Sequence, residues 1–300
     1  MFASKVSEGV YLLDTVALGH RNTIGAYVIR SSKVAIVDTG YASSQQNIFE
    51  GLSEIGVSPS EVDYIIPTHV HLDHAGASGH LMARMPNAKL IAHERAVPHL
   101  ADPSRLIDSA AKVFGREIIE LYGIPLPVPG ERMTAVGEEM SLDLGGGTTA
   151  TLMHAPGHAP HQICVMLDRQ KVLLTGDAVG VVYPGMKLLI PTTPPPSLDP
   201  RLLSDTVDRL AQMDPSMLLV PHFGAKDDPG FLFDNTKAKM SDWVAKIASM
   251  RNEGLGFDQI AESMVAEVAA EAGVGDLPIY AKVLVRTSTM GIHHYLQKNA

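Results

Sequence analysis

Three histidines and one aspartate lie close together in the run His69-Val70-His71-Leu72-Asp73-His74. The preceding segment, Asp63-Tyr64-Ile65-Ile66-Pro67, is typical of a short buried strand, and Ala75-Gly76 follows the run. A strand that ends in His-x-His-x-Asp-His presents nitrogen and carboxylate ligands at two adjacent points of one loop. This arrangement favours two neighbouring divalent metals over a single one. A histidine-rich surface loop is the alternative, and the flanking strand and turn argue against it.

Three further candidate ligands each come directly after a predicted strand. They are His158 in His154-Ala155-Pro156-Gly157-His158, Asp177 in Thr175-Gly176-Asp177, and His222 in Val220-Pro221-His222-Phe223-Gly224. Functional sites are commonly built where strand ends converge at one edge of a sheet, because the strands are rigid and the loops can vary.

Hydrophobic periodicity predicts strands and helices mixed along the whole chain rather than strict βαβ alternation, which favours packed layers of sheet and helix. A capping box at Ser43 and Gln46 predicts one helix start, and Asp199-Pro200 predicts another, with Leu203 and Val207 on its buried face. The remaining predictions are strands at 10–13, 26–29, 34–37, 89–92, 140–144, 150–153, 162–166, 172–175 and 217–220, and helices through 81–85 and over 106–121.

Two irregular segments, 97–130 and 178–197, are expected to lie over the site and to determine the choice of substrate. From residue 236 onward the pattern is helical, and apolar faces carried by residues such as Trp243 and Phe257 must be buried. We therefore expect a catalytic domain over residues 1–235. The helical extension over 236–300 is expected to pack on that domain beside the site or to form a homodimer interface.

Composition limits the function classes that need to be considered. The 300 residues are 45% hydrophobic and 19% charged, with a net charge of −9 and no cluster of Lys and Arg. This pattern argues against nucleic acid or an anionic membrane as a partner and favours a small-molecule substrate. The sequence contains no apolar run of about 18 residues, the length that spans a membrane. Cys164 is the single cysteine, so no internal disulfide can form, and with no signal-peptide pattern the cytoplasm is the expected compartment.

In the order of its motifs the chain resembles the metallo-β-lactamase-fold hydrolases over residues 10 to 225. The motifs are Val37-Asp38-Thr39-Gly40, Thr68 to Gly76, Pro156-Gly157-His158, Thr175-Gly176-Asp177 and Pro221-His222-Phe223-Gly224. The resemblance implies an α+β protein with a four-layer αβ/βα sandwich and, here, added C-terminal helices. It also implies two divalent metal ions, with zinc expected first and iron or manganese as alternatives.

The same resemblance assigns roles to individual residues. His69, His71 and His158 would hold the first metal, Asp73, His74 and His222 the second, and Asp177 would bridge them. Asp73 would also orient the attacking hydroxide and transfer a proton, and Asp38 would support a ligand histidine.

Departures from particular branches narrow the expected activity. Zinc β-lactamases place a cysteine where this chain has Asp177, and diiron oxygen reductases replace a first-cluster histidine with an acidic residue. We therefore expect a metal-bound hydroxide that attacks a small ester, lactone or phosphotriester, as in lactonase- and phosphotriesterase-like members. A thioester hydrolase of the glyoxalase II type and a mononuclear iron persulfide dioxygenase are the alternatives. A non-catalytic module on the same scaffold is a third.

For the other aromatic and histidine residues, a role in the site is compared with a role in packing or at the surface. Four aromatic residues are candidates either for a substrate pocket or for packing: Phe114, Tyr122, Tyr183 and Phe223. Six histidines that are not candidate ligands are expected to be structural or exposed, with His161 the least secure: His20, His80, His93, His99, His154 and His161.

Overall fold

The computed structural model describes residues 1–186 and 188–299 and divides the chain into two compact units. The sheet unit comprises Met1–His154, His161–Gly176 and Met217–Lys226. The helical unit comprises Ala155–Pro160, Asp177–Ser216 and Asp227–Ala300. The expected boundary at residue 235 therefore falls inside helix α8 (Pro229–Asn252). The packing of residues 236–300 on the catalytic domain stays a prediction, and Lys187 and Ala300 of the expected segments lie outside the described residues.

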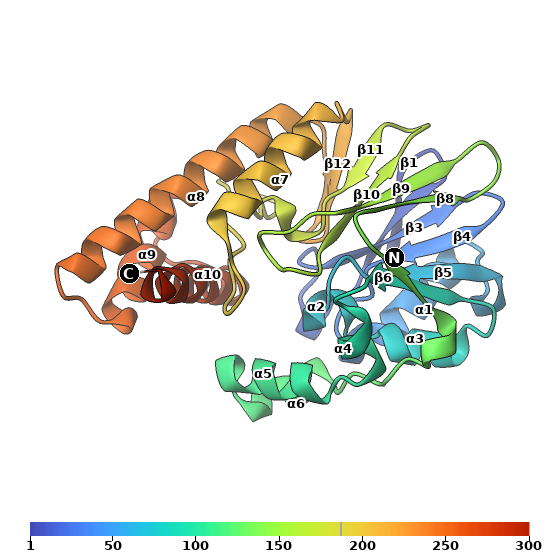
Figure 1. Ribbon diagram of the computed structural model, residues 1–300, viewed down its shortest axis with the longest axis horizontal. Helices are drawn as coiled ribbons and strands as arrows, with labels where there is room; N and C mark the ends of the chain where they lie inside the picture. Colours follow the sequence, from blue (N-terminus) through green and yellow to red (C-terminus); the bar gives the residue numbers. More distant parts are fainter. Residues whose placement is uncertain (187, 300) are drawn as a thin grey trace. The chain divides into compact units, whose positions relative to one another are not determined.

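The sheet unit holds two mixed β-sheets, which lie face to face (Figure 1). The first sheet has the order β1-β2-β3-β4-β5-β6-β7 and the second has the order β13-β12-β11-β10-β9-β8. Their bounds are β1 (Ala3–Ser7), β2 (Val10–Asp14), β3 (Gly25–Arg30), β4 (Val34–Val37), β5 (Val62–Ile66), β6 (Lys89–His93), β7 (Met133–Val136), β8 (Glu139–Asp143), β9 (Thr149–His154), β10 (Ile163–Leu167), β11 (Val172–Leu174), β12 (Met217–Val220) and β13 (Gly224–Lys226).

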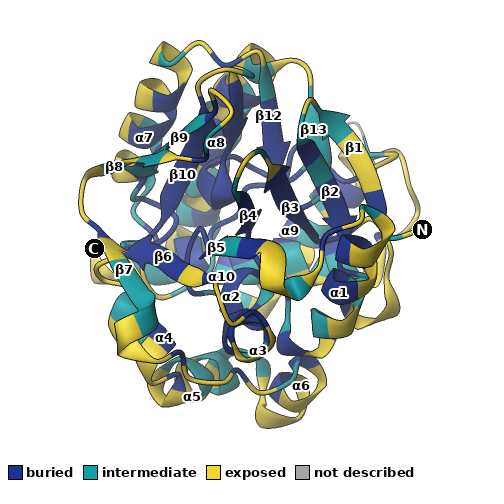
Figure 2. Cartoon of the chain, turned by 90° about the vertical axis from the view of Figure 1, so that its right-hand side faces the viewer, coloured by how far each residue is buried: buried dark blue, intermediate teal, exposed yellow. Residues whose placement is uncertain are grey.

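The central strands β3 and β4 of the first sheet are buried on both faces, as their dark ribbons in Figure 2 show. In β3 the side chains of Tyr27 and Ile29 enter the core between the sheets, whereas Val28 enters the core beneath the helices. Because successive side chains of a strand point to opposite faces of the sheet, the apolar residues of β3 contribute to both cores. The core beneath the helices, which contains Val28, also contains Ile48 of α1 (Gln45–Glu54) and Leu81 of α3 (Ser78–Arg84). The α+β sandwich expected from the sequence is confirmed.

The structure corrects several local predictions. The Ser43–Gln46 capping box is wrong, because a 3₁₀ turn over Ala42–Ser44 precedes α1 and its N-cap, Ser44, makes no side-chain capping bond. The helix predicted over 106–121 is two helices, α5 (Ser104–Phe114) and α6 (Arg116–Tyr122), because Gly115 adopts a φ of 89° between them. Three strands escaped prediction because they are short and partly exposed: β1, β7 and β13. Two short helices complete the unit: α2 (Leu72–Ala75) and α4 (Val97–Ala101).

The helical unit is built from α7 (Pro200–Gln212), α8, α9 (Phe257–Glu271) and α10 (Ile279–Lys298). The predicted N-cap of α7 is confirmed, since the Asp199 carboxylate accepts hydrogen bonds from the backbone N–H groups of Arg201 and Leu202. Trp243 and Ile260 lie in the apolar core of the unit, as their helical spacing predicts. No helix among the described residues is long and apolar enough to cross a membrane.

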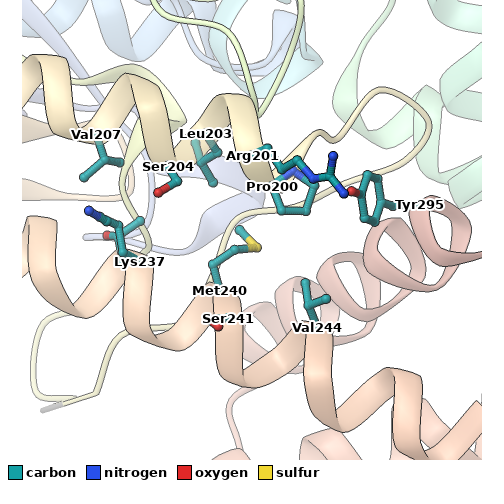
Figure 3. Close-up of a pocket in the computed structure, with 11 residues that line it drawn as sticks. Pro200, Arg201, Leu203, Ser204, Val207, Lys237, Met240, Ser241, Val244 and Tyr295 are labelled. Carbon is teal, nitrogen blue, oxygen red and sulfur yellow. The ribbon is translucent and has the colours of Figure 1, made fainter. Parts of the chain in front are cut away.

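A cavity of about 390 Å³ lies between α7, α8 and α10 of the helical unit (Figure 3). Its walls are apolar where Leu203, Val207 and Met240 line it, and Arg201 and Lys237 contribute cationic groups. The described residues that line it include no histidine, cysteine or carboxylate, so this cavity lacks the ligands that a divalent metal needs.

Two histidines connect the ends of the two sheets. His93 ends β6 and His154 ends β9, and their rings stack with centroids 4.1 Å apart. The expectation that these two histidines are structural fits this position. Burial lowers the pKa of His93, and the neighbouring His154 ring lowers it further. Folding therefore favours the neutral form of His93, compared with the unfolded chain, in which the pKa has its ordinary value of 6.5.

This shift makes folding sensitive to acid. Because the folded-state pKa is depressed, the contribution of neutral His93 is present above pH 6.5 and is lost as the pH falls below it. We expect His93→Gln to reduce the loss in free energy of unfolding between about pH 7.5 and about pH 5.5, measured by urea unfolding. His20→Gln, which removes an exposed histidine, is the matched control. Its free energy of unfolding should change with pH by the same slope as that of the wild type. Equal slopes for His93→Gln and wild type would contradict the assignment.

Candidate metal centre

Parallel strand pairs bring the motif turns of the sheet unit to common edges. In the first sheet β4 runs parallel to β5 with Val37 opposite Ile66, so the Asp38 turn and the Thr68 turn begin side by side. In the second sheet β11 runs parallel to β12, and the turn that carries His222 follows β12. Parallel strands place their carboxyl ends at the same edge, which gathers residues that are distant in sequence.

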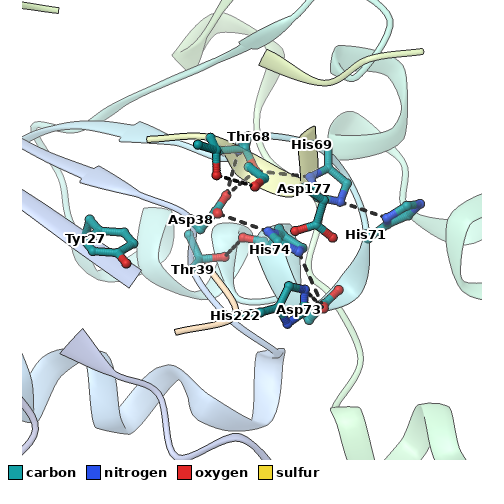
Figure 4. A network of polar contacts seen from close by, with 12 residues as sticks. Tyr27, Asp38, Thr39, Thr68, His69, His71, Asp73, His74, Asp177 and His222 are labelled. Carbon is teal, nitrogen blue, oxygen red and sulfur yellow. Dashed lines mark hydrogen bonds and ion pairs between the residues drawn. The ribbon is translucent and has the colours of Figure 1, made fainter. Parts of the chain in front are cut away.

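Asp38 is buried at the carboxyl end of β4 and accepts three hydrogen bonds (Figure 4). Its Oδ1 accepts from the Thr68 backbone N–H at 2.7 Å and from the Thr68 hydroxyl at 2.8 Å. Its Oδ2 accepts from His74 Nδ1 at 3.0 Å. Asp38 has a φ of 60°, a strained conformation for a residue other than glycine, and these bonds hold it there.

The bonds to Asp38 also set the tautomers of two histidines. A carboxylate only accepts, so the proton of His74 is on Nδ1 and Nε2 carries the lone pair. The Thr68 hydroxyl donates to Asp38, so it accepts from His69 Nδ1, 3.1 Å away. His69 therefore also carries its lone pair on Nε2, which lies 2.8 Å from His71 Nδ1. Such fixed tautomers orient imidazoles as metal ligands.

One group of potential ligand atoms in the sheet unit belongs to Asp73, His74 and His222. Asp73 Oδ2 lies 3.5 Å from His74 Nε2 and 3.7 Å from His222 Nε2, and the potential ligand atoms of the three residues lie within 4.8 Å of one another. His222 follows β12 in a turn that is held by Tyr27 of β3. The Tyr27 hydroxyl donates to the carbonyl of Val220 at 2.7 Å. This cluster of two histidines and a carboxylate suits one divalent cation.

The helical unit holds two further candidate ligands, His158 and Asp177. His158 Nδ1 donates to the Thr192 carbonyl at 2.8 Å, so its lone pair is on Nε2. That atom lies 3.5 Å from Asp177 Oδ2, and both residues are buried. A buried histidine aimed at a buried carboxylate is the arrangement that a shared cation would stabilise.

The nitrogen and oxygen atoms of the candidate ligands fit divalent metals in general and do not select one metal. The candidate ligands supply neutral imidazole nitrogens and carboxylate oxygens, which zinc, iron and manganese all accept. The single thiol is not a ligand, since buried Cys164 donates to the Thr175 carbonyl within the second sheet.

The sequence pointed to Asp38 as a residue that supports a ligand histidine, but it missed three others that help to orient the ligands. Tyr27, Thr68 and Thr192 carry no metal-ligand signal, and only Thr68, adjacent to the histidine run, gave a local indication. The ring of His161 lies 6.2 Å from His71, close to the histidine cluster. His161 follows His158 by three residues, which made a purely structural role the least secure for this histidine, and the structure places its ring near that of His71.

The four aromatic pocket candidates fall into different surroundings. Phe114 and Tyr122 share one apolar cluster, with ring centroids 6.0 Å apart. Phe223 packs against the core between the two sheets. Tyr183 is buried in the core of the helical unit against Tyr280. A role in substrate binding stays a prediction for all four.

Comparison with known proteins identifies the family. The family model of the metallo-beta-lactamase superfamily matches residues 24–222. The chain belongs to this superfamily. It is an enzyme of the metallo-hydrolase class, as the ordered motifs predicted, and its histidine and aspartate groups fit divalent metals.

The individual relatives have low sequence identity to this chain. A metallo-beta-lactamase fold-containing protein, ST1585 of Sulfurisphaera tokodaii, is 28% identical over 72% of this chain and 78% of its own length. Its crystal structure superposes with a TM-score of 0.68 at 21% identity over 96% of this chain and 98% of that chain, which shows the shared fold. The coenzyme F420H(2) oxidase of Methanothermobacter marburgensis is 28% identical over 59% of this chain and 42% of its own length. The N-acyl homoserine lactonase AttM of Azorhizobium caulinodans is 33% identical over 41% of this chain and 44% of its own.

The bonds made by Asp38 yield a prediction about metal affinity. Asp38→Asn keeps the size of the side chain but removes the charge that fixes the His74 tautomer, so we expect metal affinity to fall by about 10- to 100-fold. Competition with a chromophoric chelator measures the change. Asp63→Asn, at the opposite end of β5, is the matched control and should bind metal as wild type does. Wild-type affinity in Asp38→Asn would show that this carboxylate does not support the ligands.

Proposed function

We propose that the chain hydrolyses small esters, lactones or phosphotriesters with two divalent metals, zinc foremost. His69, His71 and His158 would hold one metal, Asp73, His74 and His222 the other, and Asp177 would bridge them. The observation that carries the proposal is the complete set of nitrogen and carboxylate donors, three of whose histidines have an Nε2 lone pair fixed by the bond that Nδ1 makes.

Chain connectivity supports one site built from both sets of ligands. His158 lies on the six-residue segment 155–160, whose two ends continue into the sheet unit at His154 and His161. Asp177 follows Gly176, the last residue of the β11 segment of the sheet unit, without any linker. Along the chain, His158 is thus four residues from the end of β9, and Asp177 is three residues from the end of β11.

Each group has a defined task in the proposed reaction. Divalent ions held by these residues would supply Lewis acidity, which would lower the pKa of water toward neutrality and so make a hydroxide nucleophile available at physiological pH. Asp73, whose side chain is 21% exposed, is the ligand that can both orient this nucleophile and pass a proton to the leaving group. Asp38 and the Thr192 carbonyl hold the histidine rings in place.

Sequence features favour hydrolysis over oxygen chemistry. The relatives include an oxidase and a lactonase, so the superfamily alone does not choose between them. In this chain His69, His71 and His74 are all histidines, whereas the resemblance leads us to expect an acidic residue among them in diiron oxygen reductases. The local similarity to the lactonase supports an ester or lactone as the substrate.

The two-metal assignment predicts a change in stoichiometry. We expect the purified chain to bind about two divalent ions. His222→Ala should bind about one and lose most of its activity, because the group formed with Asp73 and His74 loses a nitrogen donor. Elemental analysis of protein freed of excess metal measures this ratio. His20→Ala removes a histidine that lies outside all the groups and serves as the control. Two ions per chain in His222→Ala would exclude this role for His222.

The choice of water over oxygen predicts turnover without air. We expect hydrolysis of at least one activated ester, thioester, lactone or phosphotriester at equal rates with and without oxygen, and its abolition in Asp177→Ala through loss of the bridge. The same panel includes glutathione persulfide with an oxygen electrode. Oxygen uptake with the persulfide, together with no hydrolysis of any panel member, would overturn the proposed function in favour of the dioxygenase.

A further inference from the structure

Helix α7 and its N-cap hold the backbone of the turn that carries His158. The Thr206 hydroxyl donates to the Pro156 carbonyl at 2.6 Å. The backbone N–H of Asp199 donates to the Gly157 carbonyl at 2.8 Å. Gly157 has a φ of 129°, and a Cβ there would overlap the backbone of α7, so only glycine allows this approach. These contacts fix where the His158 backbone lies, but none of them involves its ring.

The ring of His158 is oriented by a different segment of the helical unit. Its Nδ1 donates to the Thr192 carbonyl at 2.8 Å, and its Nε2 lies 3.5 Å from Asp177 Oδ2. The two ring nitrogens belong to one rigid plane, so the bond at Nδ1 sets the direction of the lone pair on Nε2. A displacement of the Thr192 carbonyl would therefore turn the imidazole away from Asp177.

Helix α10 holds the residues on both sides of Thr192. The Ser288 hydroxyl donates to the Pro191 carbonyl at 2.7 Å and accepts from the Thr193 backbone N–H at 3.2 Å. The Thr193 hydroxyl donates to the Ser288 carbonyl at 2.9 Å. Ser288 and Thr193 are fully buried, where hydrogen bonds are stronger than in water. A single residue of α10 thus makes three bonds to the segment 191–193.

A glycine one turn further along α10 allows this close contact. Gly291 is buried, and a Cβ at this position would overlap the Thr193 carbonyl oxygen. Ser288 and Gly291 are three residues apart, so they share one face of the helix. Glycine is unfavourable in the middle of a helix, and here the absence of a side chain makes room for the segment 191–193.

We propose that Ser288 and Gly291 of α10 are positioning residues for the metal ligand His158. They act through the Thr192 carbonyl, because they fix the residues on either side of it. The inference rests on the proposed function, in which His158 holds one of two divalent ions, and it gives the C-terminal helix a defined task in that site. A role in packing alone would require the volume of Ser288 but not its hydroxyl.

The first test measures metal affinity and does not depend on turnover. The chain is loaded with Zn²⁺, and a chromophoric chelator withdraws the ions, which gives two dissociation constants. Ser288→Ala removes both side-chain bonds and keeps a residue that suits a helix. We expect it to raise one dissociation constant about tenfold, the lower end of the range for groups that support a ligand, and to leave the other unchanged. The same weakening should persist in a His222→Ala background, which keeps the ion at His158. Weakening confined to the ion that His222→Ala removes would overturn the proposal.

Thr289→Val is the matched control. Thr289 follows Ser288 on α10 and is equally buried, but its hydroxyl donates to the Val285 carbonyl within the same helix. We expect Thr289→Val to leave both dissociation constants unchanged. Wild-type affinities in Ser288→Ala, or an equal loss of affinity in Thr289→Val, would overturn the proposal. Should Ser288→Ala fail to fold, Thr193→Val removes one of the three bonds from the other partner, and the same outcomes decide.

NMR of protein with isotope-labelled histidine follows the ring directly. The Nδ1–H proton of His158 should exchange slowly with solvent, because it is buried and bonded to the Thr192 carbonyl. Its resonance is assigned by its loss in His158→Gln. Ser288→Ala should accelerate this exchange at least about tenfold, whereas Thr289→Val should not. An unchanged exchange rate in Ser288→Ala would show that α10 does not position the ring.

Turnover separates this inference from the proposed function. Failure of the wild-type protein to hydrolyse any panel member would reject the proposed function, while the metal affinities and the exchange of the His158 ring proton would still decide the role of α10. Hydrolysis by the wild-type protein, together with unchanged metal affinities in Ser288→Ala, would reject this inference alone.

Discussion

The buried carboxylate of Asp38 is the group on which the arrangement of the candidate ligands depends. A carboxylate removed from water is stable only with hydrogen-bond donors around it, and Asp38 obtains them from Thr68 and His74. These bonds tie the end of β4 to the end of β5 and to α2, so one charge holds three elements together. The same bonds place a lone pair on Nε2 of His69 and of His74. Stability of the turn and readiness to bind metal therefore have a common physical origin.

The sheets supply rigidity where the ligands need it. Their strands are buried and their parallel pairs end at common edges, so short turns can carry polar side chains on a firm base. The His222 turn is an example, because the Tyr27 hydroxyl on β3 bonds the Val220 carbonyl and anchors a segment remote in sequence. The proposed two-metal chemistry requires ligand positions that do not relax when the charge on the substrate changes.

The segment that the sequence leads us to expect over the site is a different kind of structure. The α5–α6 segment has little buried surface of its own and contacts the ligand loop through Leu72, Tyr41 and Tyr122. Such a segment can vary its apolar side chains without disturbing the sheets, which is how one scaffold serves many substrates. The stacked tyrosines connect the two regions, since Tyr41 follows the Asp38 turn, Tyr122 ends α6, and both rings contact the apolar cluster that contains Leu72.

The sequence by itself determined the identity of the candidate ligands, their order and their places at strand ends, because motif spacing and apolar runs are local. It also determined the Asp199 cap of α7. The resemblance led us to expect that Asp38 supports a ligand histidine, but only the tertiary structure decided that its partners are His74 and Thr68, 36 and 30 residues away. Only the tertiary structure decided that His93 stacks on His154 and that Tyr41 stacks on Tyr122. Gly115 likewise divided a helix that periodicity read as continuous. Partners distant along the chain are chosen by strand order, register and backbone turns, and these follow from packing of the whole unit rather than from any local pattern.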